Sequence, residues 1–155
     1  YFKGGGPYEF VNNIVYNWSN NNATRITQGA KVDIINNIYI PGNSSNLMAG
    51  FIFPENPELN THLFVTGNDF AYNKFKPQWH NVTWYSSIDG VSHVHKPAPQ
   101  SFKAKSRLGH SNIMIDKTRY VYKNVLNNVG ARSYDLDDLR IINEVKNRTG
   151  EIGKP

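Results

Sequence analysis

A repeat of seven residues, recurring after 24 positions, limits this chain's fold more than any other feature of its sequence. Residues 10–16 read Phe-Val-Asn-Asn-Ile-Val-Tyr, and residues 34–40 read Ile-Ile-Asn-Asn-Ile-Tyr-Ile. Apolar residues alternate around each Asn pair, which is the pattern of short strands joined by a tight corner. A period in the low twenties is typical of proteins in which each repeat adds one layer to a stack. We therefore predict parallel strands stacked layer upon layer.

A weaker third copy covers residues 63–68, Leu-Phe-Val-Thr-Gly-Asn. The stretch between the second and third copies is longer, and we expect residues 41–61 to hold an inserted loop. The alternative is that the first two copies are unrelated strand-turn units sharing an Asn-Asn dipeptide. The matching apolar residues on both sides of the dipeptide favour the repeat.

Asparagine is unusually abundant, at 21 of 155 residues. Helices disfavour Asn because its side chain competes for backbone hydrogen bonds, whereas corners accept it because it tolerates the left-handed backbone conformation. The Asn residues here lie among Val, Ile, Tyr and Phe, so disorder is not indicated. Stacked Asn corners can pass amide hydrogen bonds from layer to layer, and the repeat therefore predicts an asparagine ladder.

The second half of the chain has a different pattern. Residues 67–112 lack clean periodicity, and we expect long loops lying over the stack. Two amphipathic helices follow: one from Asp116 or Thr118 to about Asn128, and one after Asp135 that ends near Thr149. Their predicted apolar stripes are Val121, Val125 and Val129 in the first helix and Leu139, Ile142 and Val145 in the second.

Charge and composition narrow the possible partners. The net charge of +5 favours an acidic partner, but the basic residues are scattered and form no stripe of the nucleic-acid-binding kind. The absence of cysteine excludes disulfides and thiolate metal sites. No apolar run reaches the roughly 18 residues of a membrane span. On charge alone the acidic partner could be nucleic acid, an anionic surface or a polyanionic sugar, of which the scattered basic residues disfavour nucleic acid.

Two segments resemble the pectate lyases. Residues 5–18, Gly-Gly-Pro-Tyr-Glu-Phe-Val-Asn-Asn-Ile-Val-Tyr-Asn-Trp, are similar to the strand that follows the family's R-x-P-x-x-R motif. Residues 129–145 together with Asn147-Arg-Thr-Gly150 are similar to the tail of bacterial members, with Asp135, Asp138 and Arg140 filling the polar pattern. Asp137 departs from that pattern, which usually has Val there.

The resemblance implies a secreted or periplasmic enzyme that cleaves polygalacturonate by β-elimination with calcium. We accordingly expect a monomer whose partner is an acidic polysaccharide, and neither nucleic acid nor a membrane. It also implies an all-β fold, a right-handed parallel β-helix of few coils, with long loops and two C-terminal helices packed on its side. Within one domain, residues 1–112 would form the coils and residues 113–155 the helical extension.

The family's functional residues carry over only in part. Lys3 matches the second arginine of the motif and is the expected catalytic residue, while Arg25 matches a substrate-binding arginine one coil later. The spacing of 22 residues predicts that the two are neighbours in one groove. The R-x-P half of the motif would precede Tyr1, and the calcium ligands would lie further upstream. We therefore expect this C-terminal piece to have little lyase activity alone.

Other functions stay open on the residues. A non-catalytic carbohydrate-binding or structural domain would need no base. A pectin hydrolase would need paired carboxylates, for which Glu9 and Asp33, 24 positions apart, are the candidates. His93 and His95 would share a strand face and could hold zinc, although nothing in their spacing requires a metal.

Overall fold

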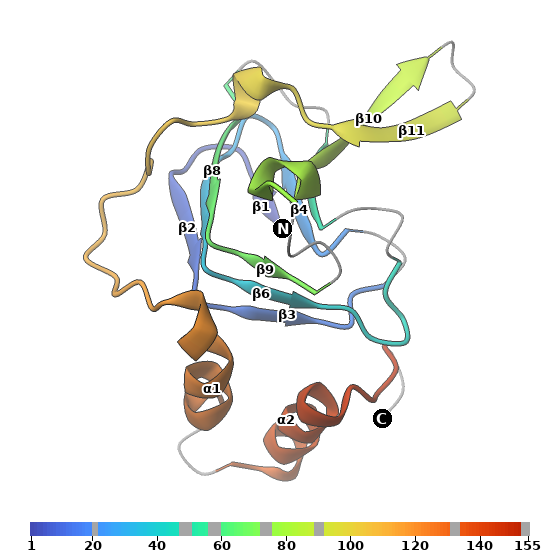
Figure 1. Cartoon of the computed structure of the whole chain (residues 1–155), viewed down its shortest axis with the longest axis vertical. Coiled ribbons are helices and arrows are strands. Elements are labelled where there is room, and N and C mark those ends of the chain that lie inside the picture. The colour runs from blue at the N-terminus through green and yellow to red at the C-terminus, as the bar shows by residue number, and fades with distance from the viewer. Residues whose placement is uncertain are drawn as a thin grey trace.

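A computed structural model of the chain describes residues 1–19, 22–46, 51–55, 60–71, 76–88, 92–130 and 134–152. Within its strands, the side chains of residues 53, 55, 85–88 and 92–96 are left undescribed. Three parallel sheets of three strands each, an antiparallel hairpin and two helices make up the described part (Figure 1).

The chain passes three times through the same three directions. Its strands, in order, are β1 Phe2–Lys3, β2 Tyr8–Val11, β3 Ile14–Tyr16, β4 Thr24–Thr27, β5 Lys31–Ile35, β6 Ile38–Ile40, β7 Ile52–Glu55, β8 His62–Thr66 and β9 Asp69–Phe70. The first, second and third strands of each pass pair with their counterparts, giving sheets β1-β4-β7, β2-β5-β8 and β3-β6-β9.

The register of these sheets follows the sequence repeat. Phe10 of β2 pairs with Ile34 of β5, and Ile34 in turn pairs with Val65 of β8, all in parallel. The prediction that the repeat stacks parallel strands is confirmed, and so is the third copy at residues 63–68. The expected loop over residues 41–61 contains a further strand, β7, which pairs with β4.

The predicted fold class, an all-β right-handed parallel β-helix, is wrong. The structure is a small mixed α/β fold, with three separate short sheets and no closed or solenoid sheet among the described residues. The strands of the three parallel sheets have only two to five residues each. The spacing of the repeat also changes, from 24 residues between Asn13 and Asn37 to 31 between Asn37 and Asn68. Among the described residues, the separate short sheets together with the hairpin and the two helices therefore give a mixed α/β arrangement.

Side chains from all three sheets meet in one core. The core contains strand residues, including Ile26 of β4, Ile34 of β5, Tyr39 of β6 and Phe70 of β9, all 1% exposed or less. The Tyr39 and Phe70 rings stack at 5.0 Å between centroids. The Tyr39 hydroxyl lies 3.0 Å from the Thr24 hydroxyl, which satisfies its polar end, and burial raises the pKa of this tyrosine.

The corner between the second and third strands of each pass uses the left-handed backbone conformation. Asn12, Asn36 and Gly67 occupy the same place in successive passes, with φ of 58°, 51° and 65°. Only glycine adopts this conformation freely, and Asn tolerates it better than most residues, so the Asn-Asn and Gly-Asn dipeptides fit the corner that they form.

The residue after each corner belongs to the predicted asparagine ladder, which is confirmed. Asn13 Nδ2 donates to Asn37 Oδ1 at 2.9 Å, and Asn37 Nδ2 donates to Asn68 Oδ1 at 3.0 Å. After the third pass, Gln78 takes the place of a further asparagine. Its Oε1 accepts from the Asn68 backbone N–H, and its Nε2 donates to the Asn68 carbonyl, both at 2.9 Å.

Residues 67–112 contain more regular structure than the expected loops. A 3₁₀ turn, η1, covers Gln78–Asn81, and an antiparallel hairpin pairs β10 Thr83–Ile88 with β11 Ser92–Pro97. Figure 1 shows the hairpin projecting away from the three sheets. A second 3₁₀ turn, η2, covers Gln100–Phe102, and from there an extended segment runs to the first helix.

Two helices close the chain, as predicted. Helix α1 is Thr118–Asn128 and α2 is Leu136–Asn147, and Figure 1 shows both beneath β3-β6-β9. Val121 of α1 packs with Ile38 and Ile40 of β6. No side chain caps α1, whereas Asp135 accepts from the Asp138 N–H and caps α2. Among the described residues, no helix has the length and apolar character to cross a membrane.

Candidate functional site

The outer face of the sheet β1-β4-β7 carries both residues predicted to act on substrate. Phe2 and Ile26 turn toward the core, so their strand neighbours Lys3 and Arg25 lie on the opposite, outer face, because side chains alternate along a strand. Lys3 is exposed and Arg25 is half-buried.

The predicted alignment of Lys3 with Arg25 is wrong by two residues. Lys3 pairs with Thr27, because the repeat in this sheet is 24 residues long and not 22. Arg25 lies on the neighbouring strand, two residues back on the same face. With about 4.8 Å between strands and about 3.3 Å per residue along them, the two Cα atoms are roughly 8 Å apart.

Tyr1 contacts Thr27 and Arg25. Its hydroxyl lies 3.2 Å from the Thr27 hydroxyl, and its ring lies 5.7 Å from the Arg25 guanidinium carbon. A planar ring beside the Arg25 guanidinium gives this face an aromatic contact surface as well as positive charge. The sequence analysis did not identify Tyr1, because a single tyrosine ahead of a short strand has no distinctive pattern.

A third cation follows at the corner next to Lys3. The turns that leave β1 and β4 enclose a shallow polar hollow of about 240 Å³, lined by Gly5, Gly6, Gln28, Gly29, Lys31 and Asn60. Lys31 is exposed, and its backbone N–H donates to the Gly5 carbonyl at 2.9 Å. The hollow therefore extends the positively charged face beyond the ends of the strands.

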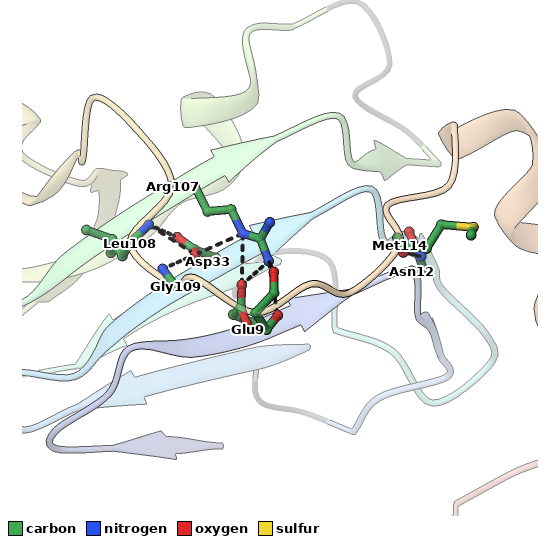
Figure 2. A network of polar contacts seen from close by, with 8 residues as sticks. Glu9, Asn12, Asp33, Arg107, Leu108, Gly109 and Met114 are labelled. Atoms are coloured by element: carbon green, nitrogen blue, oxygen red, sulfur yellow. Dashed lines mark hydrogen bonds and ion pairs between the residues drawn. The ribbon is translucent and has the colours of Figure 1, made fainter.

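The paired carboxylates considered for a hydrolase do lie side by side, but other residues of the chain already donate hydrogen bonds to them. Glu9 and Asp33 are register partners on β2 and β5. Figure 2 shows Arg107 reaching both: its Nε donates to Glu9 Oε1 at 2.8 Å and lies 3.9 Å from Asp33 Oδ2. Its Nη2 also donates to Glu9 Oε1 and to the Ser111 carbonyl.

Two backbone N–H groups complete the coordination of Asp33. Leu108 N donates at 2.9 Å and Gly109 N at 2.7 Å, and the Asp33 side chain is fully buried. A hydrolytic pair needs one carboxyl group open to substrate and one open to water. Glu9 and Asp33 instead anchor the segment that covers them.

The same arrangement argues against calcium at this pair. Calcium takes six to eight oxygen ligands and would need these carboxylate oxygens, which already accept from Arg107 and the backbone. Among the residues that the structure describes, no three His, Cys, Asp or Glu side chains come together as a metal site. The expectation of calcium ligands upstream stays a prediction, and the side chains of His93 and His95 lie outside the described part.

Several residues of these sites gave no signal in the sequence. Arg107 lies in an irregular segment nearly 100 positions from Glu9, and only the folded chain brings them together. Gln78 completes a ladder of asparagines although it belongs to no repeat. Asn68 was the exception, because the weak third copy of the repeat pointed to it.

No protein-family model matches this sequence, and no curated protein is significantly similar to it. The resemblance of residues 5–18 and 129–150 to pectate lyases therefore stays a prediction that rests on those residues.

Proposed function

We propose that this chain binds an acidic polysaccharide of the polygalacturonate type along the outer face of β1-β4-β7, as part of a secreted or periplasmic polysaccharide lyase. One observation carries the proposal: Lys3 and Arg25 lie on the same outer face of neighbouring parallel strands, and the Tyr1 ring lies beside Arg25. Lys31 adds a third positive charge at the adjacent corner. A polymer with a carboxylate on every sugar meets several such cations at once.

The proposed reaction needs positive charge for a chemical reason. The base removes the proton from C5 of a uronate, the electrons form a double bond to C4, and the glycosidic oxygen leaves and takes up a proton. That C5 proton becomes acidic only when the adjacent carboxylate is neutralised. In this scheme Arg25 binds a substrate carboxylate. Lys3 is the catalytic residue that contributes its positive charge next to the reacting sugar. Calcium would supply further neutralisation when bound.

Binding is tested with polygalacturonate and the variants Lys3→Gln, Arg25→Gln and the double variant. Each lost charged hydrogen bond should weaken binding at least about tenfold, because such bonds contribute roughly 1.5–3 kcal/mol. Lys146→Gln is the matched control, since it removes one exposed charge on α2, away from this face. Equal affinities for all four variants and the unaltered chain would disprove the surface.

Elimination is measured separately, as the ultraviolet absorbance of unsaturated products with and without a calcium chelator. We expect this chain alone to bind without much turnover. Binding that is never accompanied by elimination, even with the upstream segments of the lyase supplied, would favour the alternative of a non-catalytic carbohydrate-binding domain.

A further inference from the structure

A hollow beside β6 and β9 lies on a different sheet from the proposed polysaccharide surface. It has a volume of about 550 Å³, within the range of small-molecule sites. Its floor is the outer side of β6 and β9, including Ile38, Ile40 and Asp69, and one side is the loop that carries Ser45. Tyr122 of α1 and Arg148, just after α2, also line it.

Arg148 adopts a backbone conformation that residues with a Cβ atom rarely adopt. Its φ of 60° and ψ of 40° are left-handed, at a helix end where glycine or asparagine is usual. For a residue with a Cβ this conformation costs roughly 1 kcal/mol. This strained conformation occurs at Arg148, which places a cation at the edge of the hollow.

The guanidinium of Arg148 is held in place by a hydrogen bond and a ring contact, and it forms no ion pair with any residue that the structure describes. Its Nη1 donates to the Val145 carbonyl at 2.6 Å, and its central carbon lies 5.4 Å from the Tyr122 ring centroid. An arginine has five N–H donors, and among the described residues this one bond is all that Arg148 donates. The remaining donors include the fork of Nε and Nη2, which matches a carboxylate.

The segment around Arg148 is tied to the sheet and to the neighbouring loop. Tyr16 on β3 donates its hydroxyl to the Thr149 carbonyl at 2.5 Å, and Asn17 Nδ2 donates to the Gly150 carbonyl at 3.2 Å. The Ile152 N–H donates to Ser44 Oγ at 3.2 Å. These bonds hold the arginine and the loop at fixed places around one hollow, which is the preorganisation that a binding site needs.

We infer that this hollow binds a small polyhydroxylated carboxylate of the size of one sugar acid. The Arg148 fork would receive the carboxylate. Asp69 disfavours a second anionic group and accepts from hydroxyls, and Ser45 can bond a hydroxyl in either sense. The apolar side chains of Ile38 and Ile40 suit the C–H face of a sugar ring. The inference does not depend on the polysaccharide surface, which belongs to β1-β4-β7.

The test is an NMR titration of the chain with galacturonate, galactose and alanine as probes. Galacturonate should shift the amide signals of residues 42–45 and 148–150, with a dissociation constant of about 1 mM or tighter. Galactose lacks the carboxylate and alanine lacks the hydroxyls, so both should bind at least about tenfold more weakly. Galacturonate that leaves these signals unmoved, or that binds no better than either control, overturns the inference.

Arg148→Gly separates binding from folding. Glycine is the favoured residue at a left-handed helix end, so this variant should melt within a few degrees of the unaltered chain while losing at least about tenfold in galacturonate affinity. Arg148→Lys keeps the positive charge but loses the two-pronged donor group. Its galacturonate affinity should therefore lie between those of the unaltered chain and Arg148→Gly. Lys146→Gln removes an exposed charge on α2 that does not line the hollow, so it should leave the galacturonate affinity unchanged. If Arg25→Gln abolishes the shifts and Arg148→Gly does not, the sugar acid binds at the polysaccharide surface, and the inference about this hollow is wrong while the proposed function stands.

Discussion

At the scale of single residues, the two asparagines of each pair have different tasks. The first turns the chain through a left-handed corner and points its amide outward: Asn12 Nδ2 donates to the Met114 carbonyl at 2.8 Å, and Asn36 Nδ2 to the Asp116 carbonyl at 2.6 Å. The second joins the ladder. One dipeptide therefore both fastens an outer segment and links neighbouring layers, which explains why the repeat conserves two asparagines and not one between its first two passes.

The middle of the ladder should be the position most sensitive to substitution. Asn37 is fully buried, and its Nδ2 donates both to Asn68 Oδ1 and to the Phe10 carbonyl. Asn37→Asp keeps the shape but replaces this donor with an acceptor facing two acceptors. We expect a loss of at least about 3 kcal/mol in the free energy of unfolding, measured by urea titration.

The exposed Asn112 provides the control for that substitution. Asn112→Asp makes the same chemical change outside the ladder and should alter stability by less than about 0.5 kcal/mol. Similar losses for the two variants would show that the ladder contributes little.

The stability of the fold depends on pH through the carboxyl group of Glu9. The Ser111 hydroxyl and the Arg107 guanidinium hold the pKa of Glu9 below its ordinary value of 4.5, against the opposing effect of burial. In acid the unfolded chain takes up this proton more readily than the folded chain, so the stabilisation is present above pH 4.5 and is lost as the pH falls through the lowered pKa.

Unfolding free energies measured between pH 7 and pH 3 test this dependence. Glu9→Gln should flatten the acid limb of the curve, and Ser111→Ala should shift the loss of stability toward higher pH. An acid limb that is unchanged in both variants would mean that other carboxyl groups determine it.

At the scale of elements, the segment from Lys103 to Lys117 is neither helix nor, beyond one isolated bridge, strand, yet it is firmly attached. Arg107, Leu108 and Gly109 bind the carboxylates of β2 and β5, and the carbonyls further along bind the corner asparagines. The segment obtains its hydrogen bonds from side chains of the sheet instead of from a ladder of its own.

Arg107 should therefore contribute more to the free energy of unfolding than an ordinary surface cation does. Arg107→Gln leaves the buried Asp33 without its nearby positive charge, and removing one partner of a buried pair typically costs about 3–5 kcal/mol. We expect a loss of about 3 kcal/mol in unfolding free energy and faster proteolytic cleavage within the segment.

Arg140→Gln is the matched comparison. Arg140 pairs with Glu144 and Asp137 on the exposed side of α2, where such pairs contribute about 0.5 kcal/mol or less. If the two variants are equally stable, or if cleavage of the segment does not speed up in Arg107→Gln, the anchoring role is refuted.

At the scale of the whole molecule, the sequence predicted the repeated strand layers and the two amphipathic helices. The Asn pairs predicted parallel layers and the ladder, and the apolar stripes predicted both helices, because these patterns are local or strictly periodic. Val129 shows the limit of such patterns, since α1 ends before it and leaves it 42% exposed.

The features that the sequence did not predict depend on contacts between distant segments. The step from Lys3 to Arg25 looked like one repeat, but register is set by strand pairing, and pairing placed Thr27 beside Lys3. The hairpin β10–β11 and the Arg107 anchor lie where periodicity is lost. The overall architecture was also predicted wrongly, because a pattern seen in three layers does not reveal where the layering stops.

The asparagine ladder makes the two ends of the stack chemically different, although their strands look alike. Asn13 and Asn37 each donate their backbone N–H and one Nδ2 hydrogen to the side-chain oxygen of the following layer's asparagine, so each accepting oxygen faces the preceding layer. Gln78 supplies the last acceptor at one end, whereas at the other end Asn13 Oδ1 accepts from no described residue. The molecule thus has a hydrogen-bonding direction along its stacking axis: a strand that docked on β2 and β3 would have to bring a donor, and an identical edge, which offers another acceptor, would be a poor match.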